Sequence, residues 1–249
     1  MSRFFVSAEQ FICGRVNITG SDVNYIKNVL RLKTGSFVSV YDGRGKACLA
    51  RIDKIEKDQV GCAVVEEFAV APEPSIRITL IQGLPKGDKM ETIIQKCTEL
   101  GVSEIIPLNC ERSIVKIIQE KAAGRVSRWQ KVALEASRQC RRSVVPKVSE
   151  PKELGGVLNS LPEDALSLLF WEREDKCSLK DCLRASSSAN IFLFIGPEGG
   201  FTAEEVELAK EFGVLTLSLG PRILRTETAG PAVTAIIQYE LGDLGDARD

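Results

Sequence analysis

From residue 76 onward, the hydrophobic pattern of the chain changes period repeatedly. Short apolar runs, typical of buried strands, alternate with longer stretches in which apolar side chains recur at helical spacing. This alternation predicts an α/β domain of about six strands interleaved with helices, forming a mostly parallel sheet covered on both faces. The strands are expected at 76–82, 103–108, 166–171, 191–195 and 214–219, and the main helices at 88–100, 122–141 and 229–241, with further helices beginning near Ser178 and Thr202.

The first 70 residues follow a different pattern. Several short strand-like segments occur there, together with one stretch of helical spacing and a glycine-rich hairpin turn. These features predict a small β-barrel ahead of the α/β domain. We place the barrel at 1–70, a proline-containing linker at 71–75 and the α/β domain at 76–249. Within the barrel, strands are expected at 4–6, 37–41, 47–52 and 60–65, the helix at 22–32, and the turn at Asp42, Gly43 and Gly45.

The composition is that of an ordinary globular protein. Of the 249 residues, 44% are hydrophobic and 27% are charged, and the formal net charge is −1. No apolar run reaches the length of about 18 residues that a membrane span requires. The N-terminus also lacks the hydrophobic core of a signal peptide. We therefore expect a cytoplasmic protein with no membrane association.

Metal chemistry is not expected in this chain. The eight cysteines include no Cys-x-x-Cys pair, and histidine is absent. Zinc sites are usually built from such pairs and from histidines, so we predict no metal site. The cysteines are interpreted as small buried hydrophobic residues. The absence of histidine also means that any general base is another titratable side chain or solvent.

Positive charge is concentrated in one segment. Residues 121–147 contain eight basic residues against one acidic residue, Glu135. A local net charge of +7 in a chain of net charge −1 indicates a surface for phosphate groups, although a solvated helix face is the simpler alternative. On the predicted helix 122–141, Arg125, Arg128 and Lys131 share one face and are the candidates for contacts with RNA.

The strand predicted at 191–195 ends in the sequence Gly-Pro-Glu-Gly-Gly, residues 196–200. In open α/β sheets, ligands bind at the carboxyl ends of strands. No lysine follows these glycines, and neither the Walker pattern nor the dinucleotide pattern is present. Thr202 and Glu205 have the spacing of a capping box, so the next helix satisfies its own first N–H groups. We expect a neutral or positively charged ligand here, and a side chain at Gly199 should block its approach. The alternative is a plain strand–turn–helix connection.

A second polar loop joins the strand at 214–219 to the helix at 229–241. Structural connections of this kind usually have two to six residues. This loop is longer and carries several hydrogen-bonding side chains, which favours a ligand site formed by both loops. Those side chains are Arg222, Arg225, Thr226, Glu227 and Thr228.

The two loops together resemble those of a known family. Residues 195–200 read IGPEGG and residues 219–229 read LGPRILRTETA, and residues 86–91 (KGDKME) and 95–102 (QKCTELGV) match as well. These motifs are similar to those of the RsmE family, bacterial methyltransferases of the SPOUT class that methylate N3 of a uridine in 16S ribosomal RNA. The resemblance extends over nearly the whole chain.

The resemblance implies several further properties. The cofactor would be S-adenosylmethionine (S-adenosyl-L-methionine), held in loops of a C-terminal trefoil knot. The N-terminal barrel would be a PUA-like RNA-binding domain. The protein would act as a homodimer on 16S rRNA, within the small ribosomal subunit. The implied cofactor-binding residues are Phe170, Ile195, Gly196, Pro197, Glu198, Gly199, Gly200, Leu219, Gly220, Ile223, Leu224, Arg225, Thr226, Thr228 and Ala229.

Catalysis and RNA binding are assigned on the same basis. Arg225 is the first candidate for stabilising the negative charge that develops on the uracil, with Arg142 as the alternative if the partner subunit supplies it. Glu198 and Glu227 are the carboxylates of the motif loops, and the proton acceptor is left open between them and other groups. The positions that match the family's RNA-binding segments are Arg3, Arg31, Lys33, Gln139 and Arg142.

Three residues depart from the family pattern. Tyr25 stands where histidine is usual, Arg138 where acidic residues are common and Arg141 where glycine is common. Two other functions also remain open at this point. One is a ribose 2′-O-methyltransferase of the same fold, and the other is a non-catalytic RNA-binding protein.

Overall fold

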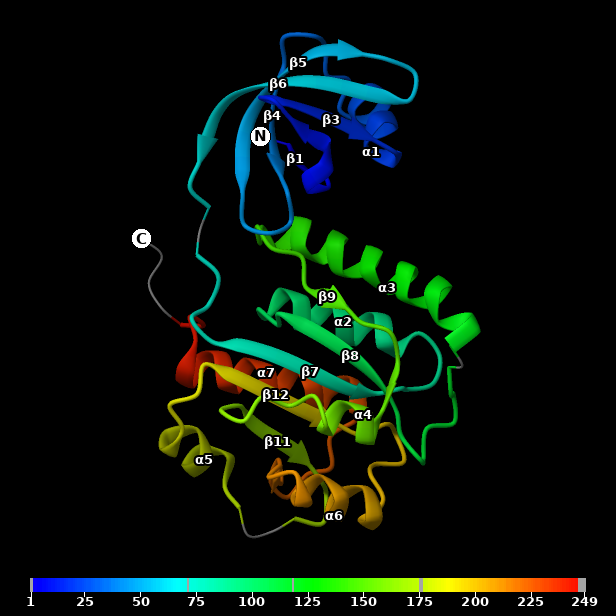
Figure 1. Cartoon of the computed structure of the whole chain (residues 1–249), viewed down its shortest axis with the longest axis vertical. Coiled ribbons are helices and arrows are strands. Elements are labelled where there is room, and N and C mark those ends of the chain that lie inside the picture. The colour runs from blue at the N-terminus through cyan, green and yellow to red at the C-terminus, as the bar shows by residue number, and fades with distance from the viewer. Residues whose placement is uncertain (1, 71, 118, 175–176, 246–249) are drawn as a thin grey trace. The chain divides into compact units, whose positions relative to one another are not determined.

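A computed structural model describes residues 2–70, 72–117, 119–174 and 177–245 (Figure 1). The chain divides into two compact units. The first comprises Met1–Glu73 with Ser137–Val145, and the second comprises Pro74–Ala136 with Pro146–Asp249. The change of unit after Glu73 lies inside the predicted linker 71–75, of which Ala71 is outside the described residues. The sequence did not predict that residues 137–145 belong to the first unit. The functional roles of the predicted domains stay a prediction.

The first unit is built on a six-stranded sheet. Only β1 and β4 pair in parallel, and the other neighbouring strands are antiparallel. Its buried core includes Phe4, Ile18, Ile26 and Ile52. The four predicted strands are present, and two further strands, β2 and β3, were missed. The order is β1 (Arg3–Phe5), β4 (Phe37–Tyr41), β5 (Ala47–Ile55), β6 (Gln59–Phe68), β3 (Arg15–Thr19) and β2 (Phe11–Ile12).

The helix predicted at 22–32 is shorter than expected. Helix α1 covers only Ser21–Asn24 and continues into a π-helical turn at Tyr25–Val29. In this wider turn the Leu30 N–H donates to the Tyr25 carbonyl, five residues earlier, at 2.9 Å. The wider turn shifts the helical register, so that Ile26 is buried while Val29 is 61% exposed. Apolar spacing alone did not distinguish this geometry from an α-helix.

Two arginines attach residues 137–145 to the rest of the first unit. Arg138 donates hydrogen bonds to the Asp22 carboxylate at 2.7 and 3.2 Å, and Arg142 donates to Glu73 at 2.6 and 3.0 Å. The Arg138 and Arg142 side chains are only 20% and 10% exposed. A partly buried charge is costly when its partner is lost, so these pairs hold the segment to the barrel. Part of the basic run is therefore structural.

Arg141 has a left-handed backbone, with φ at 67°. Glycine adopts this conformation freely, whereas other residues pay roughly 1–2 kcal/mol. This explains why a glycine would suit the position, as the resemblance suggested. The Arg3 guanidinium donates to the Arg141 carbonyl at 2.7 Å and lies 4.7 Å from the Tyr41 ring centroid. Contacts within the unit thus hold the strained backbone in place.

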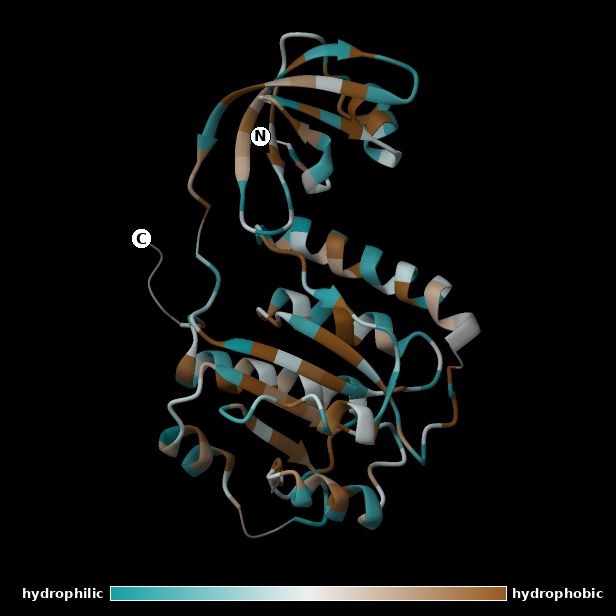
Figure 2. Ribbon diagram, viewed as in Figure 1, coloured by the Kyte–Doolittle hydropathy of each residue, from teal (hydrophilic) through white to brown (hydrophobic). Residues whose placement is uncertain are grey.

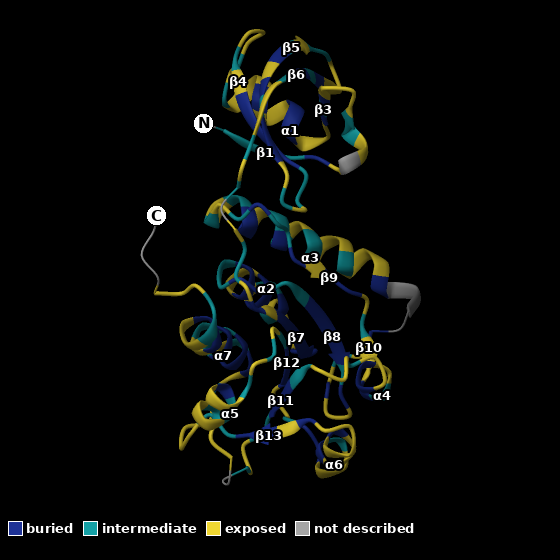
Figure 3. Cartoon of the chain, turned by 60° about the vertical axis from the view of Figure 1, so that its left-hand side comes forward, coloured by how far each residue is buried: buried dark blue, intermediate teal, exposed yellow. Residues whose placement is uncertain are grey.

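The second unit contains a parallel sheet, and the prediction of such a sheet is confirmed. All of its strand pairs are parallel, and the strands of the central sheet are predominantly apolar and buried (Figures 2 and 3). The strand order is β10 (Lys152–Glu153), β8 (Glu104–Asn109), β7 (Arg77–Gly83), β12 (Asn190–Ile195), β11 (Leu166–Phe170) and β13 (Leu215–Leu217), with β9 (Lys147–Val148) beside β8.

Helices cover both faces of this sheet. On one face, α2 (Lys89–Glu99) and α7 (Thr226–Leu241) lie side by side (Figure 1). Leu80 and Gln82 of β7 point to this face, because a Cβ on Gly230 of α7 would lie 3.6 Å from Leu80 Cδ2 and 3.4 Å from Gln82 Oε1. On the other face, Ile81 shares a buried cluster with residues of α4 (Leu154–Leu158) and α6 (Ala203–Glu211).

One helix and most of another complete the second unit, and residues 137–140 at the end of the longer helix belong to the first unit. The long helix α3 (Gln119–Cys140) carries the basic residues and alternates apolar and polar positions (Figure 2). Helix α5 (Leu179–Ala185) follows β11 and begins at an N-cap formed by Ser178. Among the described residues, no helix is both long enough and apolar enough to cross a membrane.

Candidate active site

A cavity of about 1320 Å³ opens in the second unit at the carboxyl ends of β11, β12 and β13. Both predicted loops line it, so the structure brings these two distant segments together. Of the residues implied as cofactor-binding, those that line the cavity are Phe170, Ile195, Gly196, Pro197, Glu198, Gly200, Leu219, Gly220, Ile223, Leu224, Arg225, Thr226 and Ala229.

Two of the implied residues, Gly199 and Thr228, do not line this cavity. A Cβ on Gly199 would meet Arg112 Cβ at 3.0 Å, and the predicted effect of a side chain at Gly199 on ligand binding stays a prediction. Thr228 is exposed in the first turn of α7. Gly200, in contrast, lines the cavity with φ at 66°, and a Cβ there would lie 3.2 Å from Glu172 Oε2. The positive φ of Gly200 is one that glycine adopts freely.

Helix α7 begins at Thr226, three residues earlier than predicted. Arg225 is its N-cap, with an extended backbone, and its carbonyl accepts from the N–H groups of Thr228 and Ala229 at 2.8 and 2.9 Å. Glu227 in the first turn complements the positive end of the helix dipole. The second loop therefore ends at Arg225, and Thr226 is a buried helical residue.

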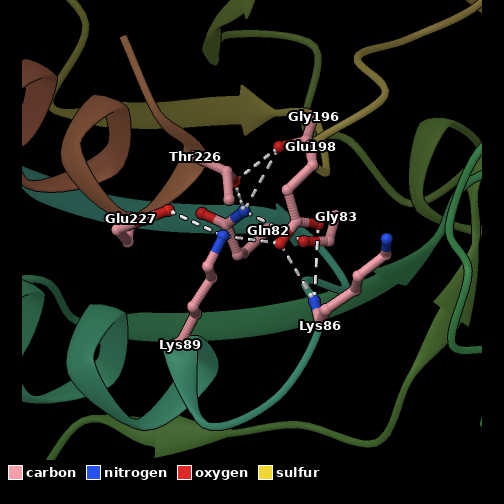
Figure 4. Close-up of polar contacts among 8 residues, drawn as sticks. All are labelled: Gln82, Gly83, Lys86, Lys89, Gly196, Glu198, Thr226 and Glu227. Carbon is pink, nitrogen blue, oxygen red and sulfur yellow. Dashed lines mark hydrogen bonds and ion pairs between the residues drawn. The ribbon is translucent and has the colours of Figure 1, made fainter.

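A buried amide connects the first loop to the start of α7 (Figure 4). Gln82, at the end of β7, donates from Nε2 to Thr226 Oγ1 at 2.9 Å, and Thr226 Oγ1 donates to the Gly196 carbonyl at 2.7 Å. Next to it, the first loop crosses directly over Gly83, where a Cβ would lie 2.5 Å from Pro197 N. Three segments far apart in sequence thus meet at the end of one strand.

An ion network lies at the edge of the cavity. Lys89 Nζ is 2.8 Å from Glu198 Oε1 and 3.4 Å from Glu227 Oε2 (Figure 4). Burial raises the pKa of Glu198, but hydrogen bonds from Lys89 and from the backbone N–H groups of Glu198 and Lys86 outweigh it and leave this pKa below its ordinary value. The bond to Glu198 raises the pKa of Lys89. Glu198 is therefore a fixed anion and a weak base near neutral pH.

The candidate catalytic arginines differ in their surroundings. Arg225 lines the cavity, and within the described part of the chain its guanidinium has no hydrogen bond or ion-pair partner. Arg142 belongs to the first unit, where Glu73 occupies its guanidinium. Arg225 is thus available to a bound molecule, whereas Arg142 would first have to leave an ion pair.

The expectation of buried cysteines holds for four of the eight, whereas Cys13 and Cys177 are exposed and Cys177 lines the cavity. Burial raises the pKa of Cys97 to about 12 and moves that of Cys110 in the same direction. Such thiols stay protonated and pack as small apolar groups. In the part of the chain that the structure describes, no three His, Cys, Asp or Glu side chains gather as a metal site would require.

Both units of the chain match known protein families. Residues 72–238 match the RNA methyltransferase domain family, and residues 18–64 match the RNA methyltransferase PUA domain. Ribosomal RNA small subunit methyltransferase E of Bacillus subtilis is 36% identical over 90% of this chain and 90% of its own length. The chain belongs to the ribosomal RNA small subunit methyltransferase E family. The motif resemblance to this RsmE family is confirmed.

Further relatives match most of the chain. The Synechocystis enzyme of the same name is 35% identical over 94% of this chain and 76% of its own length. The crystal structure of ribosomal RNA small subunit methyltransferase E from Neisseria gonorrhoeae, bound to S-adenosyl methionine, has a TM-score of 0.87 at 36% identity. It covers 98% of this chain and 99% of that one. The PUA-like unit and the parallel α/β unit are therefore those of the RsmE family.

The candidate RNA-binding residues fall in both units. On α3, Arg125, Arg128 and Lys131 are exposed as predicted, although Arg128 Nε lies 2.5 Å from Glu91. That pair is weak because the Arg128 side chain is 64% exposed. The Lys121 side chain lies outside the described part of the chain. In the first unit, the exposed candidates are Arg31, Lys33 and Gln139, while Arg3 and Arg142 are engaged as described above.

Motif reading missed several residues that shape the site. Gln82 donates a hydrogen bond to Thr226, and Gly83 leaves room for the first loop to cross β7. Lys89 forms ion pairs with the Glu198 and Glu227 carboxylates. Arg112 donates to the Gly199 carbonyl at 3.1 Å from outside the cavity. A polar residue followed by glycine at the end of an apolar strand was the available signal for Gln82 and Gly83. Lys89 lay inside a matched RsmE motif but was given no role.

Proposed function

We propose that this protein transfers a methyl group from S-adenosylmethionine to N3 of a uridine in 16S ribosomal RNA. The observation that carries the proposal is the cavity formed by both motif loops of an RsmE family member. The C-terminal trefoil knot, the homodimer and the small ribosomal subunit as the setting belong to the same proposal. We place the enzyme in the cytoplasm.

The residues of the cavity fit this cofactor. Phe170, Ile195 and Leu219 offer apolar surface for an adenine ring, and Gly200 permits close approach of backbone groups. The carboxylates of Glu172 and Glu198 suit a positively charged sulfonium. No lysine-bearing phosphate loop is present, so a nucleotide polyphosphate fits less well. When bound, the cofactor supplies the methyl group.

Arg225 is the proposed catalytic residue. Uridine N3 must lose its proton before it accepts a methyl group, and negative charge then spreads over N3, O2 and O4. A guanidinium at these oxygens stabilises that charge and lowers the effective pKa of the imide. Arg225 is free of protein partners among the described residues and stands at the cavity, so it can take this role without breaking an ion pair.

Cofactor binding tests the proposal directly. In calorimetry with the full chain, we expect S-adenosylmethionine or its demethylated product to bind and ATP and NAD to give no signal. The reason is the absence of a phosphate-binding loop. Tight binding of ATP, with no response to S-adenosylmethionine, would overturn the cofactor assignment.

The basic face of α3 provides a separate prediction. Changing Arg125, Arg128 and Lys131 together to Ala should weaken RNA binding and leave cofactor affinity unchanged. Each lost phosphate contact lowers the slope of log affinity against log salt by about 0.7 to 0.9, so the slope should flatten by roughly two units. RNA affinity is measured at several salt concentrations.

A matched control removes positive charge elsewhere in the second unit. Changing Lys152 and Lys210 to Ala takes two exposed lysines from β10 and α6, and should leave the salt slope unchanged. If the α3 variant and this control behave alike, the face of α3 is merely solvated. The RNA surface would then lie on Arg3, Arg31 and Lys33.

A further inference from the structure

Gln82 is a buried polar residue in an otherwise apolar strand. It is fully shielded from solvent, and the neighbouring inward positions Ile78 and Leu80 are apolar. Burying an amide is costly unless it is hydrogen-bonded. Gln82 Nε2 meets this requirement with bonds to Thr226 Oγ1 at 2.9 Å and to the Gly83 carbonyl at 3.0 Å, and with a longer contact to the Gly196 carbonyl at 3.5 Å.

The direction of these bonds fixes the Thr226 hydroxyl. Because Gln82 Nε2 can only donate, Thr226 Oγ1 accepts from it, and the hydroxyl proton is directed to the Gly196 carbonyl at 2.7 Å. The Gly196 carbonyl is therefore turned toward the protein interior. The next residue, Pro197, has no N–H. The position of the cavity wall at this point therefore depends on the Gln82–Thr226–Gly196 relay.

The other end of the Gln82 amide takes no part in the relay. Gln82 Oε1 is buried and has no hydrogen-bond partner among the described residues. An apolar side chain of similar shape would remove this unpaired oxygen but also the donor to the Gly83 carbonyl and to Thr226, so the two effects on stability oppose each other. The advantage of glutamine at this position lies in what its Nε2 group holds, namely the start of α7 and the first loop.

We propose that Gln82 is a positioning residue for the cofactor cavity. It acts through Thr226 and fixes the first loop relative to the start of α7, two of the segments that line the cavity. This inference rests on the proposed function, since the ligand it names is S-adenosylmethionine. Losing the relay frees the loop, and binding then has to restore its order.

The test is Gln82→Met, measured by calorimetry with S-adenosylmethionine on the full chain. We expect an affinity loss of about tenfold, the upper range for one hydrogen-bonded relay, with a melting temperature close to that of the parent protein. In turnover assays with saturating RNA, the KM for the cofactor should rise about tenfold while kcat changes by less than about twofold, because ground-state and transition-state binding are lost equally.

Gln238→Met is the matched control. Gln238 is also a buried glutamine, 1% exposed, on α7, but its side chain has no hydrogen bond to either loop. Its replacement should leave the cofactor affinity unchanged.

A second pair of variants, both at Thr226, makes the test independent of how Gln82→Met folds. Thr226→Val should weaken cofactor binding like Gln82→Met, and Thr226→Ser, which keeps the hydroxyl, should restore it.

The failures of the two proposals are distinguishable. If the parent protein does not bind S-adenosylmethionine, the proposed function falls, and this inference falls with it. If the parent protein binds and Gln82→Met and Thr226→Val bind equally well, the inference alone is overturned. A fall in melting temperature without any change in the cofactor KM would likewise show that Gln82 acts only in folding.

Discussion

Replacing Arg225 by alanine is expected to reduce kcat by about 100- to 1000-fold, the usual loss when a group that stabilises developing negative charge is removed. The cavity keeps its shape, because the Arg225 guanidinium contacts no other described residue through a hydrogen bond or ion pair. Cofactor affinity by calorimetry should therefore change little. Single-turnover methylation of small-subunit RNA measures the effect on the chemical step.

Arg222→Ala is the matched control for this prediction. Arg222 lies in the same loop, lines the same cavity and is exposed, so both variants lose one positive charge at nearly the same place. If the two arginines act only by attracting RNA, both variants raise KM by a similar factor and leave kcat unchanged. Equal losses of kcat, or no loss in Arg225→Ala, would remove Arg225 from the proposed catalytic role.

Replacing Gly83 by alanine should destabilise the fold and weaken cofactor binding together. The added methyl group would lie 2.5 Å from Pro197 N and Cδ and 2.9 Å from the Gly196 carbonyl carbon, all in or beside the backbone of the first loop. Backbone cannot give way as the end of a side chain can, so we expect a loss of about 1–3 kcal/mol in the free energy of unfolding. Denaturant unfolding and calorimetry measure the two effects.

Gly124→Ala supplies the comparison. Gly124 is exposed in α3, and a Cβ there meets nothing within 4 Å. Because glycine lowers helix stability, this change should stabilise the protein by about 0.5–1 kcal/mol and leave cofactor affinity unaltered. Should Gly83→Ala fold and bind like the parent, the close crossing of β7 by the first loop would play no part in the site.

The periodicity of the sequence was enough to predict the parallel sheet and the location of the site. Strands such as β12 are short apolar runs, and a strand buried on both faces produces that pattern directly. The ends of such strands carry the loops, so Gly196 and Arg225 could be placed at one edge before the structure was known. Local pattern and global fold agree in these segments.

Long-range pairing could not be predicted in the same way. Gln82 is separated from Thr226 by 144 positions, and nothing in the spacing of either residue indicates the other. The return of residues 137–145 to the first unit depends on Asp22 and Glu73, two carboxylates with ordinary sequence surroundings. The basic residues Arg138 and Arg142 resembled an RNA surface because charge patterning does not reveal partners.

The most direct test of the account is the identity of the methylated nucleoside. Small ribosomal subunits from cells that lack this methylation are incubated with the protein and labelled S-adenosylmethionine, and the RNA is digested to nucleosides for mass spectrometry. The proposed function predicts one labelled product, a uridine with the methyl group on N3 of the base. Label on a ribose 2′-oxygen, or on another base, would contradict it.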